Sequence, residues 1–168
     1  PLPGAISGPS TVCQGSNITL SDGTGGGTWS SSAAGIASVN AFGVVSGMSP
    51  GNALITYTVS TGCRATMPVT GNVAPGAISG APNVCVSAQT FLNDAGGGGG
   101  WSSSNGGVAT VNPSGVVTGI AAGNAIITYQ LSTGCQSIQP VTVNPLPSVI
   151  LGTLEICEAT STSLSDAD

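Results

Sequence analysis

Hydrophobic and polar residues alternate along several short stretches of this chain. In residues 52–59, NALITYTV, the apolar positions 53, 55, 57 and 59 alternate with 54, 56 and 58, and residues 124–131, NAIITYQL, repeat the pattern. A period of two places successive side chains on opposite faces of a β-strand, so one face is buried while the other meets water. No stretch of 11 residues keeps apolar positions at helical spacing. The pattern therefore predicts an all-β protein.

The chain also repeats itself with a period of 72 residues. Residues 3–72 and 75–144 are identical at 39 of 70 aligned positions. A long period built from short elements favours one small domain per repeat over a solenoid coil. We therefore expect domains at residues 1–74 and 75–146, followed by the start of a third, truncated repeat at residues 147–168.

Each repeat contains about seven short strand candidates, and turn residues separate them at intervals of about 8 to 12 residues, as in a β-sandwich. This count predicts tandem immunoglobulin-like sandwiches of about 72 residues each. A domain of this size has a thin core. We expect the alternating aliphatic side chains and four large aromatic residues to fill most of it: Trp29, Tyr57, Trp101 and Tyr129.

A sequence of motifs recurs in the same order in both repeats. It reads W-S-S-S, then I-A-S-V-N or V-A-T-V-N, then G-V-V-S-G or G-V-V-T-G, then G-N-A-L-I-T-Y or G-N-A-I-I-T-Y. This order resembles the bacterial immunoglobulin-like group 2 domain over residues 17–60 and 89–132. The resemblance implies a small sandwich strung in tandem within surface proteins such as adhesins, where many copies act as stalks.

Glycine-rich stretches precede both tryptophans, in residues 22–32, DGTGGGTWSSS, and 94–104, DAGGGGGWSSS. We interpret them as loops between strands, in which glycine permits positive φ angles and a close backbone approach beside the tryptophan. A phosphate-binding loop is disfavoured because it needs a lysine and the start of a helix, and the chain has no lysine.

An aspartate begins each of these stretches. Asp22, Asp94 and Asp166 recur at the 72-residue period. We interpret them as Asx-type turn residues, and a weak calcium ligand is the alternative.

Charged residues make up only 4% of the chain, and Arg64 is its single cation. Because a nucleic-acid groove needs several Lys or Arg side chains on one face, nucleic-acid binding is excluded. A net charge of −5 leaves little repulsion between copies, so self-association is a candidate property. The 41 Ser and Thr residues offer hydroxyls that hydrate the surface and are possible attachment points for glycans.

Cys13 and Cys63 lie 50 positions apart, as do Cys85 and Cys135, and each pair falls within one repeat. We expect these pairs to be two intradomain disulfides, each contributing roughly 4 kcal/mol by restricting the unfolded chain. Zinc is disfavoured because the chain has no His and no closely spaced Cys pair. Disulfides place the protein outside the cytoplasm.

The fifth cysteine, Cys157, matches Cys13 and Cys85 in the repeat. We expect it to be unpaired within this chain, with its partner about 50 residues downstream. A reactive thiol is disfavoured because no His or cation lies beside it in the sequence EICEA.

These observations predict a structural segment of a long extracellular repeat protein that forms a filament, fibre or cell-surface stalk. We expect no enzyme activity and no cofactor, because the chain lacks His and Lys and carries six acidic residues. The expected partners are copies of the same protein, with no membrane insertion in this segment. The alternative is an adhesin module that binds a glycan or host protein. Phe42 and Phe91 have no aromatic equivalents in the other repeat, so an exposed position is open to either of them, and we favour core residues over binding anchors.

Overall fold

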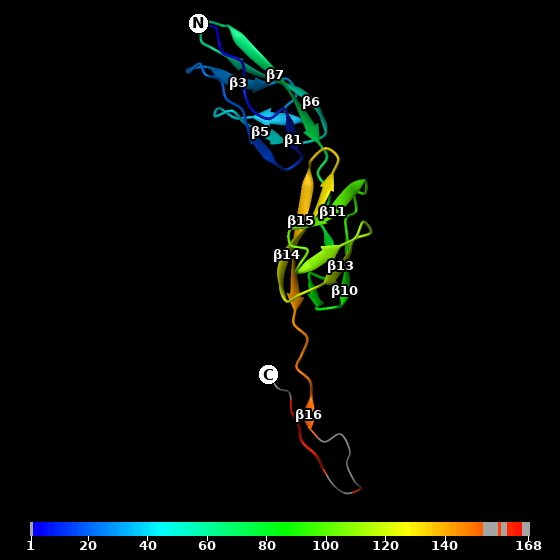
Figure 1. Ribbon diagram of the computed structural model, residues 1–168. Coiled ribbons are helices and arrows are strands. Elements are labelled where there is room, and N and C mark those ends of the chain that lie inside the picture. Colours follow the sequence, from blue (N-terminus) through cyan, green and yellow to red (C-terminus); the bar gives the residue numbers. More distant parts are fainter. Residues whose placement is uncertain (1, 153–157, 159–160, 166–168) are drawn as a thin grey trace. The chain divides into compact units, whose positions relative to one another are not determined.

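The computed structural model describes residues 2–152, 158 and 161–165. All regular elements in this part of the chain are β-strands, which confirms the predicted all-β class. The described residues form two compact units (Figure 1). The first contains residues up to 77 with 94–100 and 129–137, and the second contains 78–93, 101–128 and the residues from 138 onward. The domain boundaries expected from the sequence repeat stay a prediction.

Seven strands form the first repeat. They make two sheets, a four-stranded one in the order β1-β7-β6-β3 and a three-stranded one in the order β2-β5-β4. All their pairings are antiparallel except β1 with β7, which run parallel. The strands are β1 (Thr11–Cys13), β2 (Asn17–Thr19), β3 (Thr28–Ser31), β4 (Ala37–Val39), β5 (Val44–Gly47), β6 (Gly51–Thr58) and β7 (Arg64–Asn72).

The second repeat has the same order of strands with one short strand added. Its sheets run β11-β14-β15-β9 and β12-β13-β10-β8, and β9 again pairs in parallel with β15. The strands are β8 (Ser79–Gly80), β9 (Asn83–Cys85), β10 (Gln89–Asn93), β11 (Gly99–Ser103), β12 (Ala109–Val111), β13 (Val116–Gly119), β14 (Gly123–Leu131) and β15 (Gln136–Asn144). Beyond them, β16 (Leu151–Gly152) and β17 (Leu164–Ser165) form an antiparallel pair.

The residues that alternate in the sequence pattern also alternate between buried and exposed positions in the structure. In β6, Ala53 and Ile55 are buried, whereas Leu54 between them is exposed. Burying one face of each sheet removes apolar surface from water, at roughly 25 cal/mol per Å². The core of the first repeat consists of Val12, Leu20, Ala37, Val45, Ala53, Ile55 and Val69. Its equivalent in the second repeat consists of Val84, Leu92, Ala109, Val117, Ala125, Ile127, Val141 and Val143.

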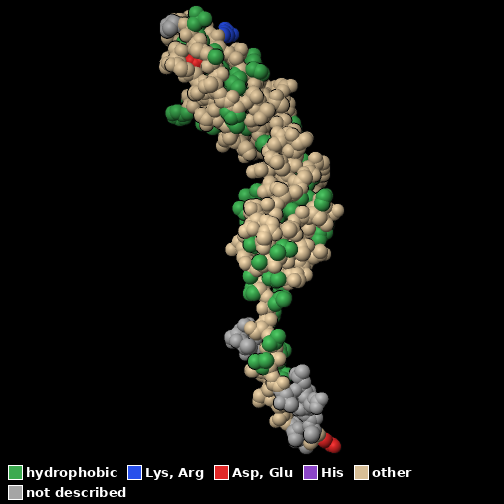
Figure 2. Space-filling view, viewed as in Figure 1, with side chains coloured by type: hydrophobic (Ala, Val, Ile, Leu, Met, Phe, Trp, Pro, Cys, Tyr) green, Lys and Arg blue, Asp and Glu red, His purple; other side chains and the backbone are tan. Residues whose placement is uncertain are grey.

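The surface is nearly free of charge. Figure 2 shows a face made mostly of uncharged polar side chains and backbone, with scattered hydrophobic side chains and very little blue or red. Two of the exposed hydrophobic residues are Phe42, at 84% exposure, and Phe91, at 56%. The interpretation of these two residues as core fillers is therefore wrong. Among the described residues, none of the regular elements is a helix that could span a membrane.

Candidate functional site

Cys13 forms a disulfide with Cys135, and 122 positions of sequence separate them. Their Cα atoms lie 5.7 Å apart, and both residues belong to the first compact unit. The bond joins the end of β1, in the first repeat, to the turn between β14 and β15, in the second. The expected pairing of cysteines within each repeat is therefore wrong.

Strand register explains why Cys13 does not bond Cys63. Cys13 is level with Asn72 at the carboxyl end of β7, whereas Cys63 directly precedes the first residue of that strand. At about 3.3 Å per residue, the length of β7 places them roughly 30 Å apart. A disulfide requires Cα atoms within about 7 Å.

The second repeat has the same geometry. Cys85 is level with Asn144 at the end of β15, while Cys135 precedes the first residue of that strand. The two cysteines of each repeat thus lie at opposite ends of their sandwich. A spacing of 50 positions could not reveal this, because the parallel pairing of the first and last strands is a tertiary feature. Cys157 lies outside the described residues.

The thiols of Cys63 and Cys85 are free in the structure. Cys85 is exposed, whereas Cys13, its equivalent in the first repeat, is half-buried. Cys63 is half-buried, whereas the bonded Cys135 is 1% exposed. Each free thiol is therefore more accessible than its bonded counterpart.

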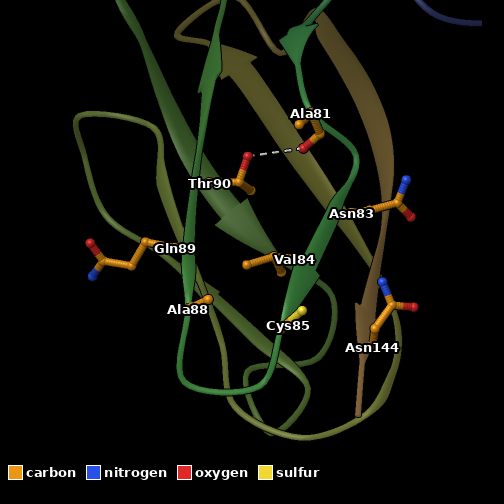
Figure 3. Close-up of a pocket in the computed structure, with 8 residues that line it drawn as sticks. All are labelled: Ala81, Asn83, Val84, Cys85, Ala88, Gln89, Thr90 and Asn144. Atoms are coloured by element: carbon orange, nitrogen blue, oxygen red, sulfur yellow. Dashed lines mark hydrogen bonds between the residues drawn. The ribbon is translucent and has the colours of Figure 1, made fainter. Parts of the chain in front are cut away.

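A hollow of about 430 Å³ lies beside Cys85. Figure 3 shows that β9 and β10 flank it, with Cys85 close to the turn that joins these strands. Because β9 and β10 belong to different sheets, their facing edges are not paired with each other. The hydroxyl of Thr90 donates a hydrogen bond across this gap to the carbonyl oxygen of Ala81, at 3.1 Å. The remaining lining residues are Asn83, Val84, Ala88, Gln89 and Asn144.

The glycine-rich loops are held by tyrosine hydroxyls. The backbone N–H of Gly27 donates to the hydroxyl of Tyr57 at 2.8 Å, and the N–H of Gly99 donates to that of Tyr129 at the same distance. A Cβ atom on Gly27 would overlap the Tyr57 ring, and one on Gly99 would lie 2.7 Å from Cζ of Tyr129. The close approach that requires glycine is therefore to tyrosine rather than to tryptophan.

The four aromatic residues expected in the cores differ in burial. Tyr57 and Tyr129 are 6% and 5% exposed. Trp29 and Trp101 are half-buried and pack against the edges of the two cores. Trp29 lies opposite Tyr57 in the β3–β6 pairing, with ring centroids 4.7 Å apart and planes tilted by 48°.

Asp22 and Asp94 form the turns that open these loops. Oδ1 of Asp22 accepts from the N–H of Thr24, and Oδ1 of Asp94 accepts from the N–H of Gly96, both at 2.8 Å. These are Asx turns. Oδ2 of each carboxylate is buried without a hydrogen-bond partner. Within the described part of the chain, no three His, Cys, Asp or Glu side chains are grouped so as to hold a metal ion. Asp166 lies outside the described residues.

Comparison with known proteins gives matches to a domain family and to a named relative. Residues 79–139 match the family described as bacterial Ig-like domain (group 2). Ice-binding protein 1 of Shewanella frigidimarina (strain NCIMB 400) is 30% identical over an alignment of 138 residues, and the match covers 70% of this chain. The chain spans about 15% of the length of that relative.

The solved structures that match this chain have low sequence identity. Domains 4 and 5 of the S-layer protein SbsC are 20% identical, with a TM-score of 0.41, over 85% of this chain and 99% of that one. The carboxyl-terminal fragment of intimin, in complex with the intimin-binding domain of its translocated receptor, is 18% identical, with a TM-score of 0.47, over 86% of this chain and 66% of that one.

Proposed function

Because residues 79–139 belong to the family of bacterial Ig-like domains of group 2, we propose that the chain is a structural segment of a long extracellular repeat protein that forms a filament, fibre or cell-surface stalk. The first repeat is identical to the second at 39 of 70 aligned positions and carries the same fold. The disulfide between Cys13 and Cys135 is the observation that carries the proposal.

This bond gives the chain a second covalent connection between its repeats. The peptide junction Val73-Ala74-Pro75 is the first, and its proline restricts backbone rotation. Tension applied at the two ends passes from residue 13 directly to residue 135, so residues 14–134 lie outside the covalent path that bears load. A link of this kind suits a protein that must transmit force without unfolding.

An extracellular location accords with the disulfide, since such bonds persist in oxidising compartments. A non-enzymatic role accords with a chain that has no His or Lys. The nearly uncharged surface leaves weak repulsion between copies, which favours lateral or end-to-end packing. The expected partners are copies of this protein, with glycans on Ser or Thr as possible attachments.

Electron microscopy of the protein purified from its source, without reductant, tests the proposal. We expect filaments or fibres in which the immunoglobulin-like repeat gives a regular axial period. A population of separate globular monomers under the same conditions would overturn the structural role.

An adhesin module is the second candidate function, and the exposure of Phe42 favours it. This side chain is 84% exposed in the turn between β4 and β5, where the Asn40 side chain holds the Phe42 backbone. Exposed aromatic residues are common anchors in binding sites. If Phe42 is an anchor, Phe42→Ala will reduce retention of protein-coated beads on a glycan array or host-cell layer at least tenfold. Unchanged retention would exclude this site.

A further inference from the structure

We propose that Cys85 and Cys63 each form an inter-repeat disulfide of the kind that joins Cys13 to Cys135. Cys85 bonds the turn cysteine of another repeat, in a Ser-Thr-Gly-Cys turn, and Cys63 bonds the strand-end cysteine of another repeat. This inference deepens the proposed function and rests on it, because it turns a single link into a repeated one along a filament.

The backbone around Cys85 is already shaped like that around the bonded Cys13. The N–H after each cysteine donates to the last residue of the neighbouring strand, Gln14 to Asn72 at 2.8 Å and Val86 to Asn144 at 3.0 Å. In both repeats a further N–H, three residues after the cysteine, donates back to the cysteine carbonyl oxygen at 3.0 Å. The strand-end half of the link is therefore preformed.

One residue shows how closely the two turns agree. Gly15 has a φ of 78° in the turn after Cys13, and Ser87 has a φ of 65° at the equivalent position after Cys85. Ser87 is the one non-glycine residue with positive φ in the described part of the chain. A side chain disfavours this conformation, so the turn keeps the geometry of the bonded repeat even where the sequence does not favour it.

The turn half of the link is preformed as well. Cys63 and Cys135 both follow the sequence Ser-Thr-Gly. The carbonyl oxygen of Cys63 accepts from the N–H of Val59 at 3.0 Å, and that of Cys135 accepts from the N–H of Leu131 at 2.9 Å. Gly62 and Gly134 have φ values of 84° and 88°. The turn that carries Cys63 thus has the same conformation as the turn that carries the bonded Cys135.

Cys85 is accessible to an incoming turn. The thiol belongs to an exposed residue and lines the hollow between β9 and β10, whose other walls include the small side chains of Ala81 and Ala88 (Figure 3). An incoming turn therefore has open space beside the sulfur. The lone Arg64 next to Cys63 is the single cation of the chain, so no Lys or second Arg repels an approaching repeat.

Bond formation is an ordinary thiol–disulfide exchange. The oxidant is a small-molecule or protein disulfide. The thiolate of one cysteine attacks it, forming a mixed disulfide and releasing one thiol, and the second cysteine then displaces the other thiol. Two protons and two electrons pass from the cysteines to the oxidant for each link formed.

Two sources supply a Ser-Thr-Gly-Cys turn: Cys63 in a second copy of this chain, or a repeat that follows in a longer protein. The first arm of the test therefore mixes ¹⁴N- and ¹⁵N-labelled full-length chain and oxidises it with glutathione disulfide, and peptides are mapped without reduction. Peptides that join Cys85 to Cys63 across isotopes identify a link between copies. The second arm maps the protein purified from its source, in which a Cys85 peptide bonded to a Ser-Thr-Gly-Cys peptide of another sequence identifies a following repeat.

Variants separate this link from other pairings. In the first arm, Cys85→Ser should abolish the Cys85–Cys63 peptide while leaving Cys13–Cys135 in place, and Cys157→Ser is the matched control that should retain both. Recovery of Cys85 as a free thiol in both arms, or bonded to Cys157, overturns the inference. Failure of the link would leave filaments visible by microscopy, whereas failure of the proposed function would remove the filaments themselves.

Discussion

The hydroxyl of Tyr57 accepts a hydrogen bond from the N–H of Gly27 at 2.8 Å and donates one to the carbonyl oxygen of Thr24 at 2.6 Å. Tyr57 is 6% exposed, and both hydrogen bonds are partly buried. One buried side chain therefore fixes both the packing of β6 and the path of the glycine-rich loop.

Replacing Tyr57 by Phe removes these two hydrogen bonds and keeps the ring. We expect Tyr57→Phe to lower the free energy of unfolding by about 1–3 kcal/mol, because the Gly27 N–H and Thr24 carbonyl groups lose their partner. Urea denaturation of the oxidised chain measures this. Phe42→Leu, on the surface, is the control and should change stability by less than about 0.5 kcal/mol. Equal stability of Tyr57→Phe and the parent would contradict the role of the hydroxyl.

The glycine next to this hydroxyl should not tolerate a side chain. Gly27→Ala places a methyl group against the Tyr57 ring, and we expect it to cost about 1–3 kcal/mol. Gly25→Ala is the matched control in the same loop, because no atom lies within 4 Å of its added Cβ and its φ is not positive. Denaturation curves that place both variants at the same midpoint would show that the close approach is absent in solution.

Trypsin distinguishes the observed disulfide from pairing within repeats. Arg64 is the sole Lys or Arg in the chain, so digestion after denaturation and alkylation of free thiols gives residues 1–64 and 65–168. Because Cys13 and Cys135 fall on different pieces, we expect the pieces to migrate together on a gel without reductant and to separate with it. Pieces that separate without reductant would contradict the Cys13–Cys135 bond. Arg64→Gln is the control and should not be cut.

Mechanical extension reports the same bond in the folded chain. We expect the oxidised protein, pulled from its ends in a force microscope, to release on the order of 40 nm of additional length once a reductant is present, at about 3.5 Å for each residue between the two cysteines. Cys135→Ser should give the longer extension without reductant, and Cys63→Ser should behave as the parent. A length that does not depend on reductant would place the bond outside the load path.

Breaking the bond should also lower stability. In the chain-entropy treatment a loop of this size contributes roughly 5 kcal/mol by restricting the unfolded chain. We expect Cys13→Ser to lower the thermal midpoint of the oxidised protein, and Cys63→Ser to leave it within a degree or two. A shift of equal size in both variants would contradict a specific contribution of the Cys13–Cys135 link.

The amino-acid sequence alone determined the fold class and the repeat. Alternation in residues 52–59 predicts which face of β6 is buried, since successive side chains in a strand must point to opposite sides. The sequence identity between the two repeats predicts that both share one arrangement of strands. The aspartates before the glycine-rich stretches predict Asx turns. These are local consequences of side-chain period and turn chemistry.

The tertiary structure alone decided which cysteines meet. A spacing of 50 positions is the same whether two residues are adjacent or at opposite ends of a domain, and Cys13 and Cys63 are at opposite ends because β1 lies parallel to β7 and ends where β7 ends. The tertiary structure also decided which aromatic side chain contacts the glycine-rich loop. Trp29 is its neighbour in the sequence, but the ring that fills the space beneath Gly27 belongs to Tyr57, which is brought there by the antiparallel pairing of β3 with β6. Contacts between distant strands depend on register, and register is set by how the sheets pair and pack.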